Sequence, residues 1–206
     1  MDPKRSSFSR AELLTFEGAL VPDLLATNVR LLFVGINPGL WTAAASAHFA
    51  RPGNRFWPAL YTAGILPRLV DARAGMTVDD LAMVNSAGIG ITNLVARASA
   101  RADELNRDEL HAGAQRLSVT VKEMKPAVVA MLGLTAYRQA FDRRTTVAGR
   151  QAERLGGAEL WVLPNPSGLN AHETVASLAS AYRQAAIAAD IAVRDIVTDI
   201  VTDSAI

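Results

Sequence analysis

The stretch "LLFVGINPGLW", Leu31 to Trp41, decides the fold and raises the main question about function. Its apolar start favours a buried strand, predicted over residues 30–36, which runs directly into a Gly-Ile-Asn-Pro-Gly turn. Asparagine is a poor strand residue, and its amide offers both a donor and an acceptor. The sequence therefore asks whether Asn37 only shapes the turn or presents its amide to a ligand.

Predicted strands and helices alternate along the rest of the chain. Further strands are expected at 88–95, 126–133 and 158–168, the first of these being a strand or a glycine-punctuated turn. Helices are expected at 10–20, 55–66, 101–125, 134–142 and 172–193, and loops at 42–54 and 143–157. This order predicts an α/β fold, a three-layer α/β/α sandwich with a short, mainly parallel central sheet.

The chain length is that of one domain with short extensions. It has 206 residues, and 50% of them are hydrophobic, enough for a single compact core. We expect the main domain at residues 21–189, an N-terminal extension with a short helix at 1–20, and a tail at 190–206. The tail repeats "DIVT" twice, and the sequence assigns it no function.

The composition excludes several kinds of chemistry. The chain has no cysteine, which rules out disulfides, thiolate-held clusters and cysteine nucleophiles. Its three histidines, His48, His111 and His172, lack the spacing of metal ligands, so neither a metal nor another cofactor is expected. The start lacks the apolar core of a signal peptide, and no run is long enough to span a membrane. We therefore expect a cytoplasmic protein.

The charge pattern leaves two interpretations open. The net charge is only +1, but arginine dominates the 21 basic residues. A group of arginines could form a local surface for phosphates, or it could belong to a solvated surface of mixed charge. The group comprises Arg51, Arg55, Arg97, Arg101, Arg143, Arg144 and Arg150.

Two Asn-Pro turns occupy matching places in the predicted fold. "GINPG" follows the first strand and "PNPSG" ends the last, and ligands of open α/β sheets bind beyond the carboxyl ends of the strands. Either each asparagine merely caps its turn, or Asn37 and Asn165 both face one site.

"GINPGLWTAAASAHFARPGNRFW" and "NPSGLN" resemble the two signature segments of the mismatch-specific uracil-DNA and thymine-DNA glycosylases. These enzymes form a branch of the uracil-DNA glycosylase superfamily, and "GIGITNLV" is similar to a third segment of the family. The resemblance covers residues 21–189. It implies a monofunctional DNA-repair hydrolase that flips uracil or a mismatched pyrimidine out of double-stranded DNA and hydrolyses the N-glycosidic bond. It further implies a monomer, associated with the nucleoid in a bacterium.

The resemblance implies roles for residues around the flipped base. Asn37 would orient the attacking water, and because an amide cannot take a proton at neutral pH, slow turnover is expected. Phe49 would stack on the base, while backbone groups of Ile36 and Phe49 would read the uracil edge. Thr42 would lie near C5 of the base, and Asn165 would stabilise charge on the departing base.

The second signature segment implies contacts with the duplex. Leu169 would fill the vacated place in the base stack, and backbone groups of Gly168 and Asn170 would face the opposite guanine. In "NRFW", Asn54 and Arg55 are expected to brace the loop.

This sequence departs from the family at two places. Ala171 stands where members often have an arginine, which puts one duplex contact in doubt. Asn93 stands where members can have a charged side chain, so it is either an auxiliary catalytic residue or a neutral capping residue.

Two other functions remain as alternatives to the glycosylase. A catalytically weak or inactive DNA-binding protein on the same fold would suit the low net charge. An unrelated nucleotide-binding α/β enzyme is disfavoured, because the chain has neither G-x-G-x-x-G nor a P-loop motif.

Overall fold

The computed structural model describes residues 7–195, and its centre is a five-stranded sheet. The strand order is β2–β1–β3–β5–β4. Four strands run parallel and one edge strand, β4, runs antiparallel to β5. The strands are β1 (Leu31–Gly35), β2 (Ile89–Asn93), β3 (Val128–Leu132), β4 (Gly149–Leu155) and β5 (Ala158–Leu163). The predicted α/β fold with a mainly parallel sheet is confirmed.

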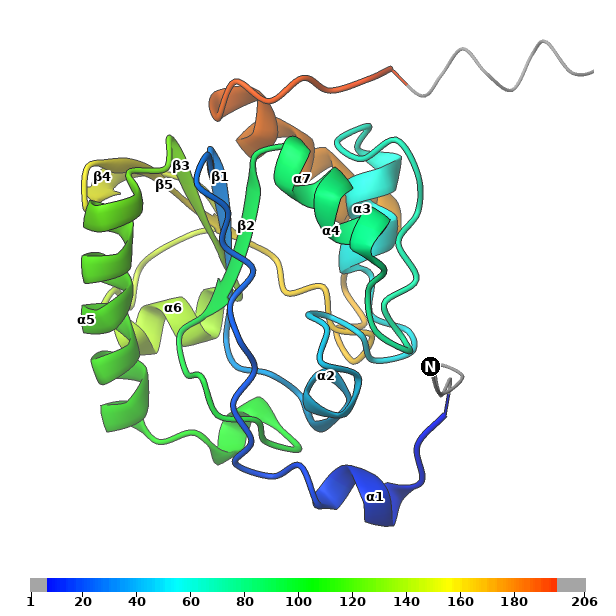
Figure 1. The fold of residues 1–206 in the computed structure, drawn as a ribbon. Helices are drawn as coiled ribbons and strands as arrows, with labels where there is room; N and C mark the ends of the chain where they lie inside the picture. Colours follow the sequence, from blue (N-terminus) through cyan, green and yellow to red (C-terminus); the bar gives the residue numbers. More distant parts are fainter. Residues whose placement is uncertain (1–6, 196–206) are drawn as a thin grey trace, which may run out of the picture.

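Helices cover both faces of the sheet (Figure 1). One face carries α3 (Phe56–Thr62), α4 (Val78–Ser86) and α7 (Val175–Ala188), and the other carries α5 (Arg107–Met124) and α6 (Leu134–Ala140). Three short elements lie near the carboxyl ends of the parallel strands: α1 (Arg10–Leu14), α2 (Leu40–Ala45) and the 3-10 helix η1 (Ala102–Glu104). The arrangement is the expected three-layer sandwich.

Burial on both faces explains why the central strands read as unbroken apolar runs. In β1, Phe33 packs into the cluster formed with α3 and α7, while Leu32 and Val34 pack into the cluster formed with α5 and α6. All five residues of β1 and all five of β3 are buried. Parallel strands covered by helices on both sides need this composition.

Sequence-local signals fix several helix starts. Asn106 accepts a hydrogen bond from the backbone N–H of Glu109, and the Glu109 carboxylate accepts one from the backbone N–H of Asn106, which is a capping box at the start of α5. Thr77 and Asp80 make the same reciprocal pair at the start of α4. These pairs satisfy donors that a helix start would otherwise leave unpaired.

The structure corrects three predicted elements. Residues 42–54 were expected to form a loop, but Thr42 to Ala45 belong to α2, where Thr42 and Ala43 are buried against their neighbours. Residues 143–157 were also expected to be a loop, but 149–155 form the edge strand β4, whose mostly exposed residues give it a polar sequence. The helix expected at 10–20 ends at Leu14.

The structure shortens the last predicted helix. The helix expected over 172–193 runs from Val175 to Ala188. The repeated tail, from residue 196 onwards, lies outside the described residues. Within residues 7–195, no helix is long and apolar enough to cross a membrane.

Candidate active site

A cavity of about 400 Å³ lies at the carboxyl ends of the parallel strands. Its walls come from the turn after β1, the start of α2, the loop 48–54, the end of β2, the loop 99–103, the end of β3 and the turn after β5. Seven of the nine predicted site residues line it: Ile36, Asn37, Thr42, Phe49, Asn93, Asn165 and Leu169. The other two, Gly168 and Asn170, flank Leu169. The volume is within the range of small-molecule sites.

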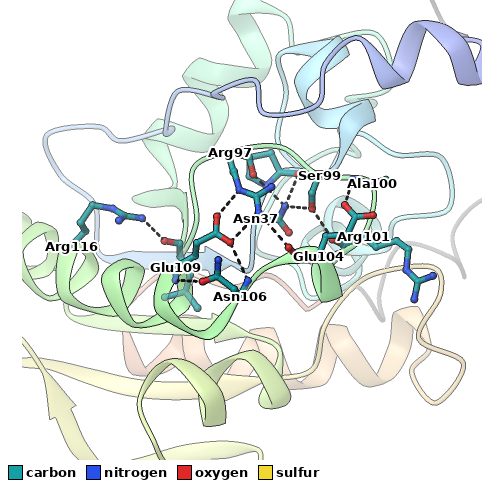
Figure 2. Close-up of polar contacts among 11 residues, drawn as sticks. Asn37, Arg97, Ser99, Ala100, Arg101, Glu104, Asn106, Glu109 and Arg116 are labelled. Carbon is teal, nitrogen blue, oxygen red and sulfur yellow. Dashed lines mark hydrogen bonds and ion pairs between the residues drawn. The ribbon is translucent and has the colours of Figure 1, made fainter.

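The amide of Asn37 is held in one orientation (Figure 2). Its Nδ2 donates to the backbone oxygens of Pro38 at 3.1 Å and Arg97 at 3.3 Å, and to Ser99 Oγ at 2.8 Å. Backbone oxygens only accept hydrogen bonds, so Nδ2 must face them. The Asn37 oxygen, Oδ1, is therefore left as an acceptor at the cavity, and it has no partner among residues 7–195.

Ser99 fixes the direction of this hydrogen-bond chain. Its hydroxyl donates to the backbone oxygen of Arg101 at 2.7 Å. A hydroxyl has one proton, so Ser99 Oγ must accept from Asn37. Ser99 is only 1% exposed, so water does not compete for these contacts. Asn37 Oδ1 is therefore an acceptor without a partner among residues 7–195, and the groups around Nδ2 hold it in place.

Asn93 ends β2 beside the end of β1. Gly35 and Asn93 are partners in the parallel register of the two strands. A Cβ atom at position 35 would lie 2.4 Å from Asn93 Oδ1 and 3.6 Å from Phe49 Cζ. A side chain at position 35 would therefore have to displace the Asn93 side chain, whereas Phe49 lies at an ordinary contact distance.

Phe49 has one ring face occupied within the protein. It stacks on Phe56 with ring centroids 3.9 Å apart and an interplanar angle of 24°. Its φ of 55° is left-handed, a strained conformation for a bulky residue, and such strain is found at functional sites. Phe49 is partly buried and lines the cavity.

The neighbour of Phe49 anchors this loop. His48 is 4% exposed, and one ring nitrogen, Nε2, lies 3.0 Å from the backbone oxygen of Pro22. Burial lowers the pKa of His48, which favours a neutral ring that donates from Nε2. Trp57 Nε1 donates to the backbone oxygen of His48 at 2.9 Å, which ties the loop to α3.

Thr42 and Ile36 also line the cavity. Thr42 is buried in the first turn of α2, and its backbone oxygen accepts from Ala47 N–H. The backbone oxygen of Ile36 accepts from Val95 N–H at 2.9 Å, so one of its two lone pairs is already used.

Asn165 both shapes its turn and lines the cavity. Its Oδ1 accepts from the backbone N–H of Ser167 at 3.0 Å, which is an Asx turn. With Oδ1 so held, Nδ2 points towards Gly133, where a Cβ atom would lie 3.8 Å away, and it has no acceptor among residues 7–195. The two readings of this asparagine, cap and site residue, are therefore compatible.

Leu169 projects from the turn after β5. The side chain is 75% exposed, a high value for a leucine next to a cavity. The turn is held by Asn170 Nδ2, which donates to the backbone oxygen of Asn165 at 3.2 Å, and by Leu169 N–H, which donates to Ser167 Oγ at 3.3 Å.

The seven arginines singled out in the sequence do not gather at one place. Arg51 and Arg101 line the cavity, whereas Arg143 and Arg150 pair with Glu153 and Glu159 of the β4–β5 hairpin. Arg143 and Arg150 therefore agree with the interpretation as a solvated surface of mixed charge.

Arg97 connects the site to α5. Its side chain pairs with Glu109 and its backbone oxygen accepts from Asn37 (Figure 2). The Arg97 guanidinium, together with the Asn106 N–H, lowers the pKa of Glu109 to about 2.

Sequence reasoning missed Gly35, Ser99 and the loop 99–103. A glycine at the end of a strand, two residues before a signature asparagine, is a signal that could have indicated the close approach at Gly35. Ser99 lies four residues beyond the third segment, and no local pattern links it to Asn37. Among residues 7–195, no three His, Asp or Glu side chains are placed to hold a metal ion.

The sequence profile of the uracil DNA glycosylase superfamily matches residues 22–189, which is most of the chain. This chain belongs to the uracil DNA glycosylase superfamily. The match includes both Asn-Pro turns and the segment that ends in Asn93, but it does not resolve a branch within the superfamily.

A solved structure agrees with this assignment at the level of the fold. The solution NMR structure of a candidate uracil DNA glycosylase from Methanosarcina acetivorans aligns with a TM-score of 0.55. The two sequences are 18% identical, and the alignment covers 81% of this chain and 97% of the other. The likeness is thus to the fold of the three-layer sandwich.

Proposed function

We propose that this superfamily member is a monofunctional DNA glycosylase that removes uracil, and other mismatched or damaged pyrimidines, from double-stranded DNA. The observation that carries the proposal is the fixed amide of Asn37, a residue that lines the cavity and whose Oδ1 has no partner among residues 7–195. In this reaction the bond between C1′ of the sugar and N1 of the base breaks. The base leaves with the electron pair, and water attacks C1′.

Asn37 Oδ1 would accept a hydrogen bond from the attacking water and aim its oxygen at C1′. An amide oxygen cannot take the proton at neutral pH, so Asn37 positions the water and is not a general base. Its contribution is orientation, which is effective only because three neighbouring groups already hold the amide. Release of the proton to solvent then follows, and slow turnover is the expected consequence.

The cavity walls supply the remaining contacts in this proposal. The free face of the Phe49 ring would stack on the flipped base, an interaction typically worth about 1–3 kcal/mol. Backbone groups of Ile36 and Phe49 would read the edge of uracil, and Thr42 would contact its C5 side. Asn165 Nδ2 would donate to a base oxygen that gains negative charge as the bond breaks.

Leu169 and its neighbours would act on the duplex. The exposed leucine would enter the base stack at the place of the flipped nucleotide, as apolar wedges do in other DNA-binding proteins. The backbone groups of Gly168 and Asn170 would face the guanine left unpaired opposite.

A panel of duplexes tests the proposal directly. Each duplex carries one uracil, thymine or etheno-adduct opposite each of the four bases, and base release is followed under single-turnover conditions by alkaline strand cleavage. We expect release from the guanine–uracil duplex by the parent protein and a loss of most of it in Asn37→Ala, purified identically. A parent protein that binds these duplexes but releases no base would instead be the inactive DNA-binding alternative.

A further inference from the structure

The guanidinium of Arg55 contacts the turn that carries Leu169. Its Nη1 donates to the backbone oxygens of Asn170 at 2.9 Å and Ser167 at 3.5 Å, and its Nη2 donates to that of Gly168 at 3.3 Å. The backbone N–H of Arg55 also donates to the oxygen of Pro166 at 2.9 Å. Arg55, the N-cap residue of α3, therefore contacts four backbone oxygens of the turn, those of Pro166, Ser167, Gly168 and Asn170.

A second contact fixes the same two segments at close range. The backbones of Gly53 and Gly168 meet, since a Cβ atom at position 168 would lie 2.7 Å from the Gly53 oxygen. Such an approach is possible only without a side chain at position 168. The turn 165–170 thus rests directly on the loop that contains Phe49.

On the side away from the turn, Arg55 is followed by a residue of the hydrophobic core. The residue after Arg55 is Phe56, which is fully buried, stacks on Phe49 and packs edge-on against Phe33 of β1. A chain of direct contacts therefore runs from the turn that carries Leu169, through Arg55 and Phe56, to the ring of Phe49. The planar fork of an arginine can hold several oxygens in fixed directions, which a lysine cannot do.

We infer that Arg55 is a positioning residue that holds the turn carrying Leu169 in a fixed position relative to the ring of Phe49. Opening of the duplex by Leu169 and stacking of the flipped base on Phe49 then depend on one joint, the contacts of Arg55 with the turn 165–170. The inference rests on the proposed function. Arg55 has no carboxylate partner among residues 7–195, and its hydrogen bonds all go to the turn it supports. A wedge held only by its own turn would yield when pushed against stacked bases.

The joint matters for duplex DNA and not for single strands. A uracil in a single strand needs no wedge, because it is not stacked within a helix. Arg55→Gln and Arg55→Lys should each lower the single-turnover rate on a guanine–uracil duplex by about ten- to hundredfold, the scale of a misplaced group. The rate on a uracil-containing single strand should stay within about twofold, a change too small to reflect a lost contact in the transition state.

Two further variants distinguish loss of the joint from loss of a positive charge and from loss of the fold. Arg51→Gln removes the same charge from the same loop, but Arg51 makes no side-chain hydrogen bond to any residue of 7–195, so it should affect duplex and single strand alike. Gly168→Ala leaves Arg55 intact and pushes the two loops apart at Gly53, so it should reproduce the duplex-specific loss. Thermal unfolding of each variant shows whether the fold is kept.

A double-mutant cycle then tests whether Arg55 acts through Leu169. In the Leu169→Ala background, Arg55→Gln should have little further effect on the duplex rate, and 2-aminopurine placed beside the uracil should report reduced flipping in both single variants. The salt dependence of duplex binding should keep its slope in Arg55→Gln, whereas loss of a phosphate contact would lower that slope by about 0.9.

Each result has a definite reading. A parent protein that releases no uracil from either substrate overturns the proposed function and the inference with it. If the parent is active, two results overturn the inference alone. One is an equal loss of rate in Arg55→Gln on duplex and single strand. The other is an effect of Arg55→Gln on the duplex rate that is as large in the Leu169→Ala background as in the parent. Rescue by Arg55→Lys would also overturn it, because charge and not the fork would then suffice.

Discussion

Asn93 Oδ1 occupies the space that a side chain at Gly35 would need, only 2.4 Å from the Cβ position of that residue. The two residues are register partners at the ends of β1 and β2, next to the Asn37 turn. The sheet itself thus sets the place of Asn93 relative to Asn37. A change at Gly35 should therefore report on Asn93 without altering any atom of Asn93.

Gly35→Ala should displace the Asn93 side chain and spare the backbone, because the crowded atom is the end of a side chain. We expect a stability loss of about 1–3 kcal/mol from overpacking and a slower base release, close to that of Asn93→Ala. Urea unfolding and single-turnover cleavage measure the two effects. In an Asn93→Ala background the alanine should be tolerated better, and full parental activity of Gly35→Ala beside an impaired Asn93→Ala would contradict this reading.

Ser99→Ala should loosen the amide of Asn37. It removes the 2.8 Å contact with Asn37 Nδ2 while leaving the two backbone acceptors in place. One hydrogen bond of this kind is worth about 0.5–1.5 kcal/mol, so we expect base release to fall by about two- to tenfold, less than in Asn37→Ala. Ser99→Thr keeps the hydroxyl and serves as the control. Equal rates for Ser99→Ala and the parent would remove Ser99 from the positioning of Asn37.

Glu109 should make stability depend on pH in the acid range. Arg97 and the Asn106 N–H lower its pKa from 4.5 to about 2 in the folded protein. A carboxylate whose pKa is lowered by folding stabilises the fold above its unfolded pKa, and this contribution disappears as pH falls from about 4.5 towards 2. Glu109→Gln keeps an acceptor for Asn106 but does not titrate. Its free energy of unfolding should therefore change less steeply than that of the parent between pH 5 and 2 in urea titrations, and identical slopes would contradict the assignment.

The sequence predicted the parallel strands of the sheet but not the antiparallel edge strand β4. The runs at β1 and β3 are continuously apolar because helices cover both faces, and this signal is local and strong. The edge strand β4 was missed since its residues are mostly exposed and polar, and exposed residues carry little information about backbone pairing. The helix α2 was missed because its run of small residues has no clear periodicity.

The site was predicted in part for a similar reason. Parallel strands bring their carboxyl ends to one edge, so Asn37, Asn93 and Asn165 could be placed together from chain order alone. The partners that orient them could not. Ser99 meets Asn37 across 62 positions of sequence, and Arg55 meets Gly168 across 113. Contacts of this length depend on loop conformations that no local pattern specifies.

The sequence leaves open whether Asn93 is an auxiliary catalytic residue or a capping residue, and substitutions at position 93 can distinguish the two roles. An asparagine there can accept or donate a hydrogen bond but cannot take a proton. Asn93→Asp would place a carboxylate of similar size at the edge of the cavity that also holds Asn37. If Asn93 is close enough to influence the attacking water, the new carboxylate should act as a general base and raise the rate of base release.

The sign of the pH dependence follows from the chemistry of a base. Only the ionised carboxylate can take a proton, so the Asn93→Asp rate should rise with pH through the pKa of the new group and then level off. A tenfold rise would correspond to about 1.4 kcal/mol in the barrier. Asn93→Ala should be slower than the parent, but less so than Asn37→Ala, and it should show no such step. Single-turnover rates of all four proteins from pH 5 to 9 measure this. If both Asn93 variants follow the parent at every pH while folding normally, Asn93 only ends its strand, and Asn37 acts without it.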